Sequence, residues 1–112
     1  MAVRKLDKKQ WRAFLDGVSK VLQGARAEVE VLSLALGDQL EAEWLPLLGM
    51  TYEPREDVVE IALEGVDHMI RKPREIYVDE GMAGIMSVEI VDAEGVRQIV
   101  KLREPLMLPA PA

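Results

Sequence analysis

The chain has 112 residues, of which 49% are hydrophobic and 30% charged, and its net charge is −6. The length fits one domain, and the composition is that of a folded protein rather than a disordered one. The absence of cysteine excludes disulfides, thiolate zinc sites and cysteine nucleophiles. Neither a membrane-spanning apolar run nor a clean signal-peptide core is present, so we expect a cytoplasmic, unanchored protein.

The charge is distributed unevenly along the chain. Residues 1–12 carry five basic and one acidic side chain, a net charge of +4, so the remaining residues together stand at −10. An acidic body repels phosphate backbones, whose neutralisation by Lys and Arg supplies most non-specific nucleic-acid affinity. Nucleic-acid binding is therefore disfavoured, although a local basic patch remains compatible with it.

The first predicted element is a helix over residues 8–23. Asp7 is suited to cap it, Gln10 occupies the third position of a capping box, and Gly24 is suited to end it. The apolar residues recur with helical spacing, which predicts one buried stripe. This stripe contains Trp11, Phe14, Leu15, Val18, Val21 and Leu22.

Residues 27–48 follow the period of a β-strand and predict a hairpin that turns at Gly37 and Asp38. In that register, three leucines lie on the face opposite Val29. They are Leu32, Leu34 and Leu36. Three leucines on one face require a cover, such as the helix, the curvature of the sheet or a partner chain. This leucine face is therefore a candidate surface for self-association.

The second half of the chain reads as further antiparallel strands. Pro46 is expected to end or bend the second strand. A second hairpin spans 58–71 with a tight turn at residues 64–65, and a last hairpin spans 85–102. Between them we expect a short strand at 75–78 and a mobile glycine-containing loop at 79–84.

Together these elements predict an α+β domain over residues 1–103. One N-terminal helix packs on a strongly bent antiparallel sheet or small β-barrel of about six strands. The proline-rich residues 104–112 are expected to form an extended or disordered tail.

Residues 45–78 carry several short patterns. These are Pro-Leu-x-Gly at 46–49, Tyr52 with Pro54, Ile-x-Leu-x-Gly at 61–65, and His68-x-Ile70 followed by Pro73. On the basis of these patterns, nearly the whole chain resembles a family of small uncharacterised bacterial proteins. The family is a domain of unknown function. The resemblance implies a stand-alone bacterial cytoplasmic domain and no particular reaction.

The single histidine, His68, is a candidate interaction residue on the second hairpin. The tight turn places it opposite Ile61, on the core-facing side. We expect a half-buried imidazole that bonds a backbone carbonyl or a carboxylate. A catalytic role would require a partner group, and the context of Ser19, Ser33 and Ser87 resembles no nucleophile motif. One histidine and no cysteine also leave little for a metal, so we expect no catalytic residue, metal or cofactor.

A basic cluster directly follows this strand and consists of Arg71, Lys72 and Arg74. Pro73 holds the preceding residue extended, which splays the cationic side chains toward an anion or an acidic partner. We expect instead that they pair internally with acids of the neighbouring strand, which are abundant and close in the predicted register. Those acids are Glu56, Asp57 and Glu60.

These observations favour a non-enzymatic interaction or structural module that either binds a protein partner or self-associates through the leucine face. We expect no contact with a membrane. The alternative is a small-barrel nucleic-acid-binding protein that uses the basic N-terminus and the cluster at 71–74. The small number of aromatic residues counts against the alternative, because single-stranded nucleic acids bind by stacking. An enzyme is the third possibility.

Overall fold

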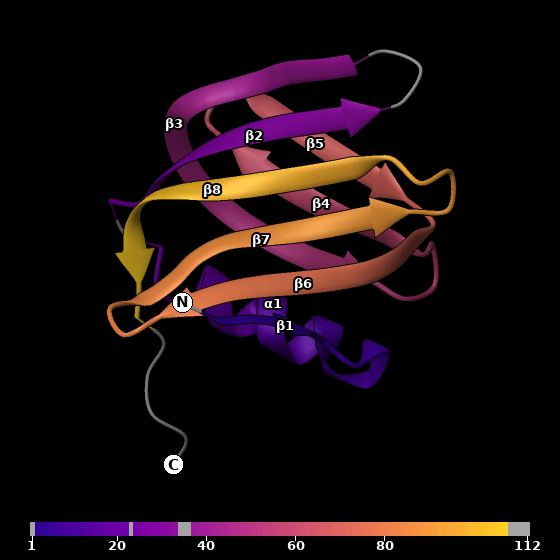
Figure 1. Cartoon of the computed structure of the whole chain (residues 1–112), viewed down its shortest axis with the longest axis horizontal. Helices are drawn as coiled ribbons and strands as arrows, with labels where there is room; N and C mark the ends of the chain where they lie inside the picture. Colours follow the sequence, from indigo (N-terminus) through magenta and orange to yellow (C-terminus); the bar gives the residue numbers. More distant parts are fainter. Residues whose placement is uncertain (1, 23, 34–36, 108–112) are drawn as a thin grey trace.

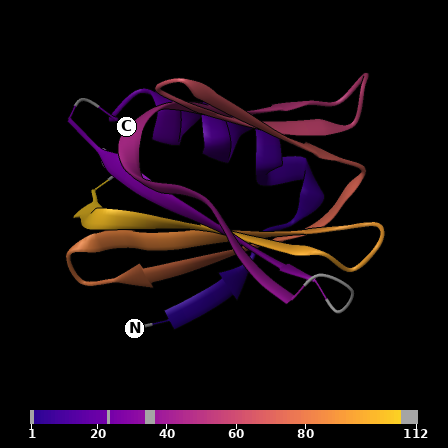
Figure 2. The same cartoon turned by 90° about the horizontal axis from the view of Figure 1, so that it is seen from above.

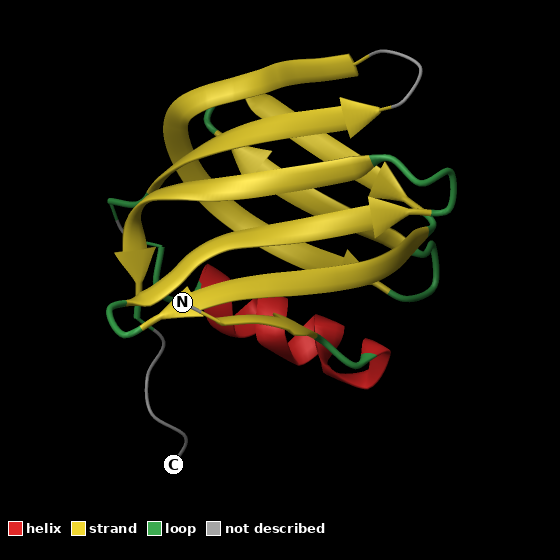
Figure 3. Cartoon of the chain, in the orientation of Figure 1, coloured by secondary structure: helices red, strands yellow, loops and turns green. Residues whose placement is uncertain are grey.

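The computed structural model describes residues 2–22, 24–33 and 37–107. A single-turn 3-10 helix, Lys8–Gln10, precedes the α-helix α1, Trp11–Ser19. The strands are β1 Ala2–Lys5, β2 Arg26–Ser33, β3 Gly37–Glu53, β4 Val58–Leu63, β5 Val66–Arg71, β6 Pro73–Gly81, β7 Gly84–Asp92 and β8 Arg97–Leu106 (Figure 1, Figure 3).

All strand pairs are antiparallel, and they form one sheet in the order β1-β6-β7-β8-β2-β3-β4-β5. The α+β class and the bent antiparallel sheet are confirmed. The barrel is not: β1 and β5 end the sheet without pairing to each other, and the described residues form eight strands rather than about six. The strand β1 was missed because Ala2–Lys5 is short and charged, with no alternating pattern.

The sheet folds over on itself along β3, which is 17 residues long. Its first half pairs with β2 and its second half with β4. The bend expected near Pro46 is confirmed, and it is marked by Trp44, whose φ of 52° lies in the left-handed region. Figure 2 shows β6, β7 and β8 on one side of the molecule, with β4, β5 and α1 on the other. The helix packs beside the second half of β3.

The core lies between these two layers. The predicted helix stripe is largely confirmed: Trp11, Leu15, Val18 and Leu22 are buried, whereas Phe14 is half-buried. The capping interaction is also present, because the Asp7 N–H donates to Gln10 Oε1 at 3.2 Å. The helix ends earlier than predicted, however. Its last residue, Ser19, is fixed to β3 by its side chain, and turns lead the chain to Gly24 (φ 79°).

The hairpin predictions had mixed outcomes. The second hairpin has the predicted register, with Leu63 opposite Val66, and Gly65 is left-handed at φ 81°. The last hairpin also turns where predicted, next to a left-handed Gly95. The first hairpin is present, because β2 pairs with β3, but its predicted turn at Gly37 and Asp38 was wrong: Ser33 pairs with Gly37, and residues 34–36 between them lie outside the described residues. Two register shifts around Val29 separate this pairing from the regular alternation that the prediction assumed.

Two segments expected to be irregular belong to the sheet. The loop expected at 79–84 is mostly strand, since Gly81 pairs with Gly84 and leaves only Met82 and Ala83 as a turn. Residues 104–106, expected in the tail, continue β8. At Gly84, a Cβ would lie 2.5 Å from the carbonyl oxygen of Leu106, so only glycine permits this close approach. Residues 108–112 of the expected tail lie outside the described residues. No helix in the described part of the chain is long and apolar enough to cross a membrane.

Candidate functional site

The structure separates the candidate residues into three places. His68 and Arg71 lie on β5, Lys72 joins β5 to β6, and Arg74 lies in β6. Leu32 is half-buried on β2. Leu34 and Leu36 lie outside the described residues, so the leucine face as a whole remains a prediction.

His68 is half-buried opposite the fully buried Ile61, as the hairpin register predicted. The expected hydrogen bond at its buried Nε2 is not found, because no group among the described residues lies within bonding distance of this atom. The neighbouring positions on the core-facing side of β5 are Val66 and Ile70. These aliphatic neighbours offer neither a nucleophile nor an acid–base partner.

The basic cluster lies at an open hollow of roughly 400 Å³, which we call the basic corner. It is lined by Lys8, Asp57, Lys72, Pro73, Arg74 and Ala93. They come from the single-turn helix before α1, from the connections β3–β4, β5–β6 and β7–β8, and from the first two residues of β6, which are Pro73 and Arg74. Arg71 does not line it, because strand alternation points Arg71 to the exposed face of β5.

Backbone hydrogen bonds hold the three connections together. The Lys72 N–H donates to the Asp57 carbonyl oxygen at 2.9 Å, and the Ala93 N–H donates to the Lys72 carbonyl oxygen at 2.9 Å. Asp57 (φ 53°) and Lys72 (φ 54°) are both left-handed, which is uncommon for residues other than glycine. The extended conformation expected for Lys72 before Pro73 was therefore wrong, because both backbone groups of Lys72 are held by these hydrogen bonds. The corner is therefore a defined structure, with its side chains projecting from fixed backbone positions.

Buried aromatic residues support the corner from the core side. The Tyr52 hydroxyl donates to Asp57 Oδ1 at 2.7 Å, and the Tyr52 and Trp11 rings meet edge to face with centroids 5.3 Å apart. Lys8 Nζ lies 5.6 Å from the centroid of the Trp11 ring, within the range of a cation–π interaction. Burial, together with the hydrogen bond to Asp57, raises the pKa of Tyr52 to about 12. Tyr52 is therefore a neutral donor at physiological pH.

The expected internal pairing of the basic cluster was wrong for the part of the chain that the structure describes. The ion pairs among the described residues join Arg4 to Glu80, Lys5 to Glu75, Arg97 to Glu89 and Lys101 to Glu30. None of these pairs involves Lys8, Arg71, Lys72 or Arg74. The physical reason at Asp57 is that its carboxylate accepts the Tyr52 hydroxyl instead.

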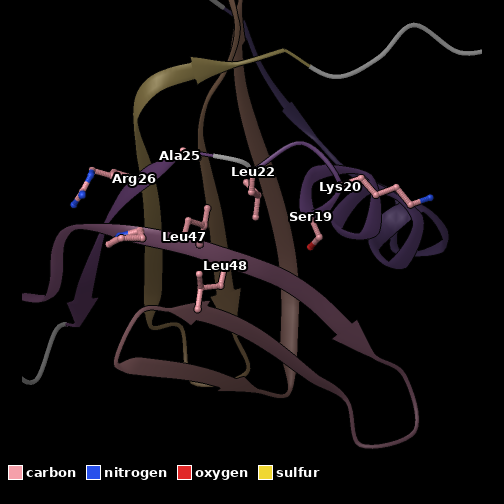
Figure 4. A pocket seen from close by; sticks show the side chains of 9 residues that line it. Ser19, Lys20, Leu22, Ala25, Arg26, Leu47 and Leu48 are labelled. Carbon is pink, nitrogen blue, oxygen red and sulfur yellow. The ribbon is translucent and has the colours of Figure 1, made fainter.

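A second hollow lies at the end of α1, where the chain passes to β2 and β3 (Figure 4). Lys20 and Arg26 extend away from each other there, so they do not converge on a shared ligand. The Ser19 hydroxyl donates to the Met50 carbonyl oxygen at 2.7 Å and accepts the Met50 N–H at 2.9 Å. Both bonds make Ser19 a clamp between α1 and β3 rather than a nucleophile.

The described residues contain no group of three or more His, Asp or Glu side chains that could hold a metal ion. The basic corner, by contrast, gathers three cations that pair with no described acid. The sequence analysis singled out two of them, Lys72 and Arg74, but counted Lys8 only as part of the basic N-terminus. No local pattern could reveal that Lys8 meets Lys72, because the two residues are far apart in the chain.

Comparison with known proteins agrees with the resemblance noted from the sequence. An uncharacterised protein of the bacterium Aquifex aeolicus (strain VF5) is 42% identical over 110 residues, which cover 97% of this chain and 99% of that protein. No solved structure matches. The model of a family of unknown function, DUF5335, matches residues 2–111. The chain therefore belongs to this family.

Proposed function

We propose that this protein is a non-enzymatic interaction module whose basic corner binds an acidic segment of a partner protein. The observation that carries the proposal is that three cations from separate segments line one hollow, and none forms an ion pair with a described residue. These cations are Lys8, Lys72 and Arg74. Unpaired cations on defined backbone positions favour carboxylate ligands, because charge-assisted hydrogen bonds are the stronger kind.

The balance of charge at the corner supports an anionic ligand. Asp57 contributes one negative charge, but Oδ1 of its carboxylate already accepts the Tyr52 hydroxyl. The three cations therefore exceed the acids that line the hollow by two. In a chain of net charge −6, this is a local reversal of sign, which attracts acidic segments and orients their approach.

A protein partner fits better than a nucleic acid for two reasons. The acidic body of the molecule opposes a long phosphate backbone. The aromatic residues next to the corner are also turned inward: Trp11 is 2% exposed and Tyr52 7% exposed. A binder of single strands stacks bases on exposed rings, and these two rings are not accessible for stacking.

The corner also lacks the parts of an active site. Proton transfer requires a group whose pKa lies near the working pH, whereas the pKa of Tyr52 is raised to about 12. No serine, threonine or histidine is among the described residues that line the hollow. This supports binding without chemistry.

The test uses a fluorescent oligoglutamate peptide as the probe and anisotropy as the readout. Lys72→Gln combined with Arg74→Gln removes two of the three cations. Lys20→Gln combined with Arg103→Gln is the matched control, since it removes two exposed cations outside the corner. We expect the corner variant to lose about tenfold or more in affinity, equal to about 1.4 kcal/mol, and the control much less.

An equal loss in the two variants would show that only net charge matters, which would contradict a site at the corner. A labelled oligothymidylate provides the second comparison. If it binds more tightly than the peptide and the corner variant abolishes that binding, the nucleic-acid alternative replaces the proposal. If neither probe binds at low salt, the corner is not an anion site.

A further inference from the structure

The two ends of the sheet differ in what they leave unpaired. At β5, the tight turn makes Leu63 and Val66 a hydrogen-bonded pair with β4. Antiparallel pairing alternates, so Val66, His68 and Ile70 direct their backbone groups toward β4, and the residues between them direct theirs away. Those outward residues are Asp67, Met69 and Arg71. Their outward N–H and C=O groups bond no described residue.

The side chains at these positions are also exposed, and Met69 is 44% exposed. Edge strands are commonly protected by charged side chains, especially lysine, by proline or by a β-bulge. The strand β5 contains no lysine or proline, and its register with β4 has no shift. It is a regular edge that presents an apolar side chain between two opposite charges.

We propose that β5 pairs with β5 of a second copy of this chain, antiparallel and centred on Met69. In this register Met69 lies opposite Met69, and Asp67 of each copy lies opposite Arg71 of the other. The outward backbone groups of all three residues then face each other, as a hydrogen-bonded ladder requires. Cross-strand pairs of opposite charge are favourable, and a twofold axis creates both at once.

Other symmetric registers are less favourable because of where they place the charges of Asp67 and Arg71. Centring the pair on Asp67 places two aspartates opposite each other, and centring it on Arg71 places two arginines opposite each other. Like charges directly opposite are destabilising. Centring the pair on His68 or Ile70 avoids like charges, but it places Met69 opposite Asp67 or Arg71 and brings no opposite charges together. Only the centre at Met69 pairs Asp67 with Arg71 on both sides of the axis, so the order Asp-x-Met-x-Arg favours that centre.

The other edge, β1, does not share this property. It contains Arg4 and Lys5, which would bring cations together in a symmetric pair. Both are already used within the chain, by Glu80 and Glu75 respectively. A dimer through β5 would instead join β3, β4 and β5 of two copies into one continuous sheet. Because an edge contact alone buries little surface, we expect a weak dimer.

Sedimentation velocity over a range of protein concentrations at low salt tests this pairing. The unchanged protein is expected to form a dimer as its concentration rises. Asp67→Arg and Arg71→Asp, made singly, place like charges opposite each other and should weaken the dimer about tenfold or more. The double variant Asp67→Arg with Arg71→Asp restores unlike charges and should recover dimerisation to within about threefold of the original.

Two further variants locate the contact. Met69→Lys places two lysines at the centre and should give a monomer, whereas Val3→Lys changes the exposed residue of β1 and should dimerise normally. Thermal unfolding confirms that each variant is folded, which the exposure of these side chains favours. A protein that stays monomeric at every concentration overturns the proposal. A dimer that survives Met69→Lys, or a charge swap that fails to restore pairing, also overturns it.

Dimerisation through β5 and peptide binding at the basic corner can be tested separately. The corner variant Lys72→Gln with Arg74→Gln leaves Asp67, Met69 and Arg71 unchanged, so it should dimerise like the original chain. Loss of peptide binding with intact dimerisation identifies two separate sites.

Discussion

The outer face of the layer that contains β6, β7 and β8 differs from the basic corner in whether its charged side chains are paired. On the outer face, Lys5 Nζ lies 3.0 Å from Glu75 Oε2, and Lys101 Nζ lies 3.5 Å from Glu30 Oε1. Arg97 directs two of its nitrogens at one oxygen of Glu89. In the corner, the cations pair with none of the described acids. The difference indicates that the outer charges offset one another, whereas the corner keeps a local positive potential.

The backbone explains why the two regions differ. The outer pairs join neighbouring strands, where regular register brings side chains from different strands close together. Lys5, for example, lies opposite Tyr77, whose hydroxyl donates to Glu75 at 2.9 Å. The corner is built from connections and from the start of β6, where left-handed residues such as Asp57 and Lys72, and the register shift between Pro73 and Glu75, interrupt this alternation. Its charges therefore have no cross-strand partner imposed by the ladder.

The largest expected effect comes from removing the support of the corner. Trp11→Ala deletes a buried ring that contacts both Lys8 and Tyr52. We expect the free energy of unfolding to fall by about 3–5 kcal/mol, the usual cost of a large cavity. Urea denaturation measures it, with Val3→Ala as the control at an exposed site. A loss below about 1 kcal/mol would show that the ring is not packed as described.

The next effect is expected at Tyr52. Tyr52→Phe removes the hydrogen bond to Asp57 and should cost about 1.5–3 kcal/mol, the range for bonds to charged groups. The folded pKa of about 12 exceeds the ordinary tyrosine value of 10.0. The stability due to Tyr52 is thus complete below pH 10 and is lost as the pH rises toward 12. Urea midpoints across this window should fall less steeply in Tyr52→Phe, and equal slopes would contradict the raised pKa.

Arg97 and Arg74 test whether charges on the outer face contribute to stability and charges in the corner do not. Arg97→Gln breaks a surface ion pair and should lower stability by up to about 1 kcal/mol. Arg74→Gln breaks none and should change stability by no more than about 0.5 kcal/mol. Thermal unfolding at low and high salt measures both. If Arg74→Gln proves the more destabilising, the corner charges are structural and the contrast between the two regions fails.

The smallest effect concerns Glu75. Hydrogen bonds from Lys5 and from the Tyr77 hydroxyl, together with the charge of Lys5, lower the pKa of this carboxyl below its ordinary value of 4.5. A lowered folded pKa means that its contribution is present above pH 4.5 and is lost as the pH falls through the folded value. Glu75→Gln should therefore flatten the acid side of the stability profile slightly. An unchanged profile from neutral pH down to about pH 3 would show that this network adds no stability.

Much of the fold could be predicted from the sequence because the deciding interactions are local. Glu64 and Gly65 determine a two-residue turn, and that turn alone sets the register of β4 with β5. The helix stripe and its Asp7–Gln10 cap follow from spacing within a few residues. Alternation likewise placed His68 opposite Ile61. The resemblance to a family of small uncharacterised bacterial proteins agrees with the family to which the chain belongs.

Other features were decided only by the tertiary structure, because they depend on residues far apart in the chain. The strand β1 exists because β6 offers an edge to Ala2–Lys5, not because its own sequence favours a strand. The first hairpin departs from its expected register because Ser33 pairs with Gly37, ahead of the predicted turn, and further irregularities follow around Val29, where β2 lies between β3 and β8. The basic corner forms because backbone hydrogen bonds join Asp57, Lys72 and Ala93. Local patterns determine turns and faces, whereas long-range packing determines which charges meet and which are left without a partner.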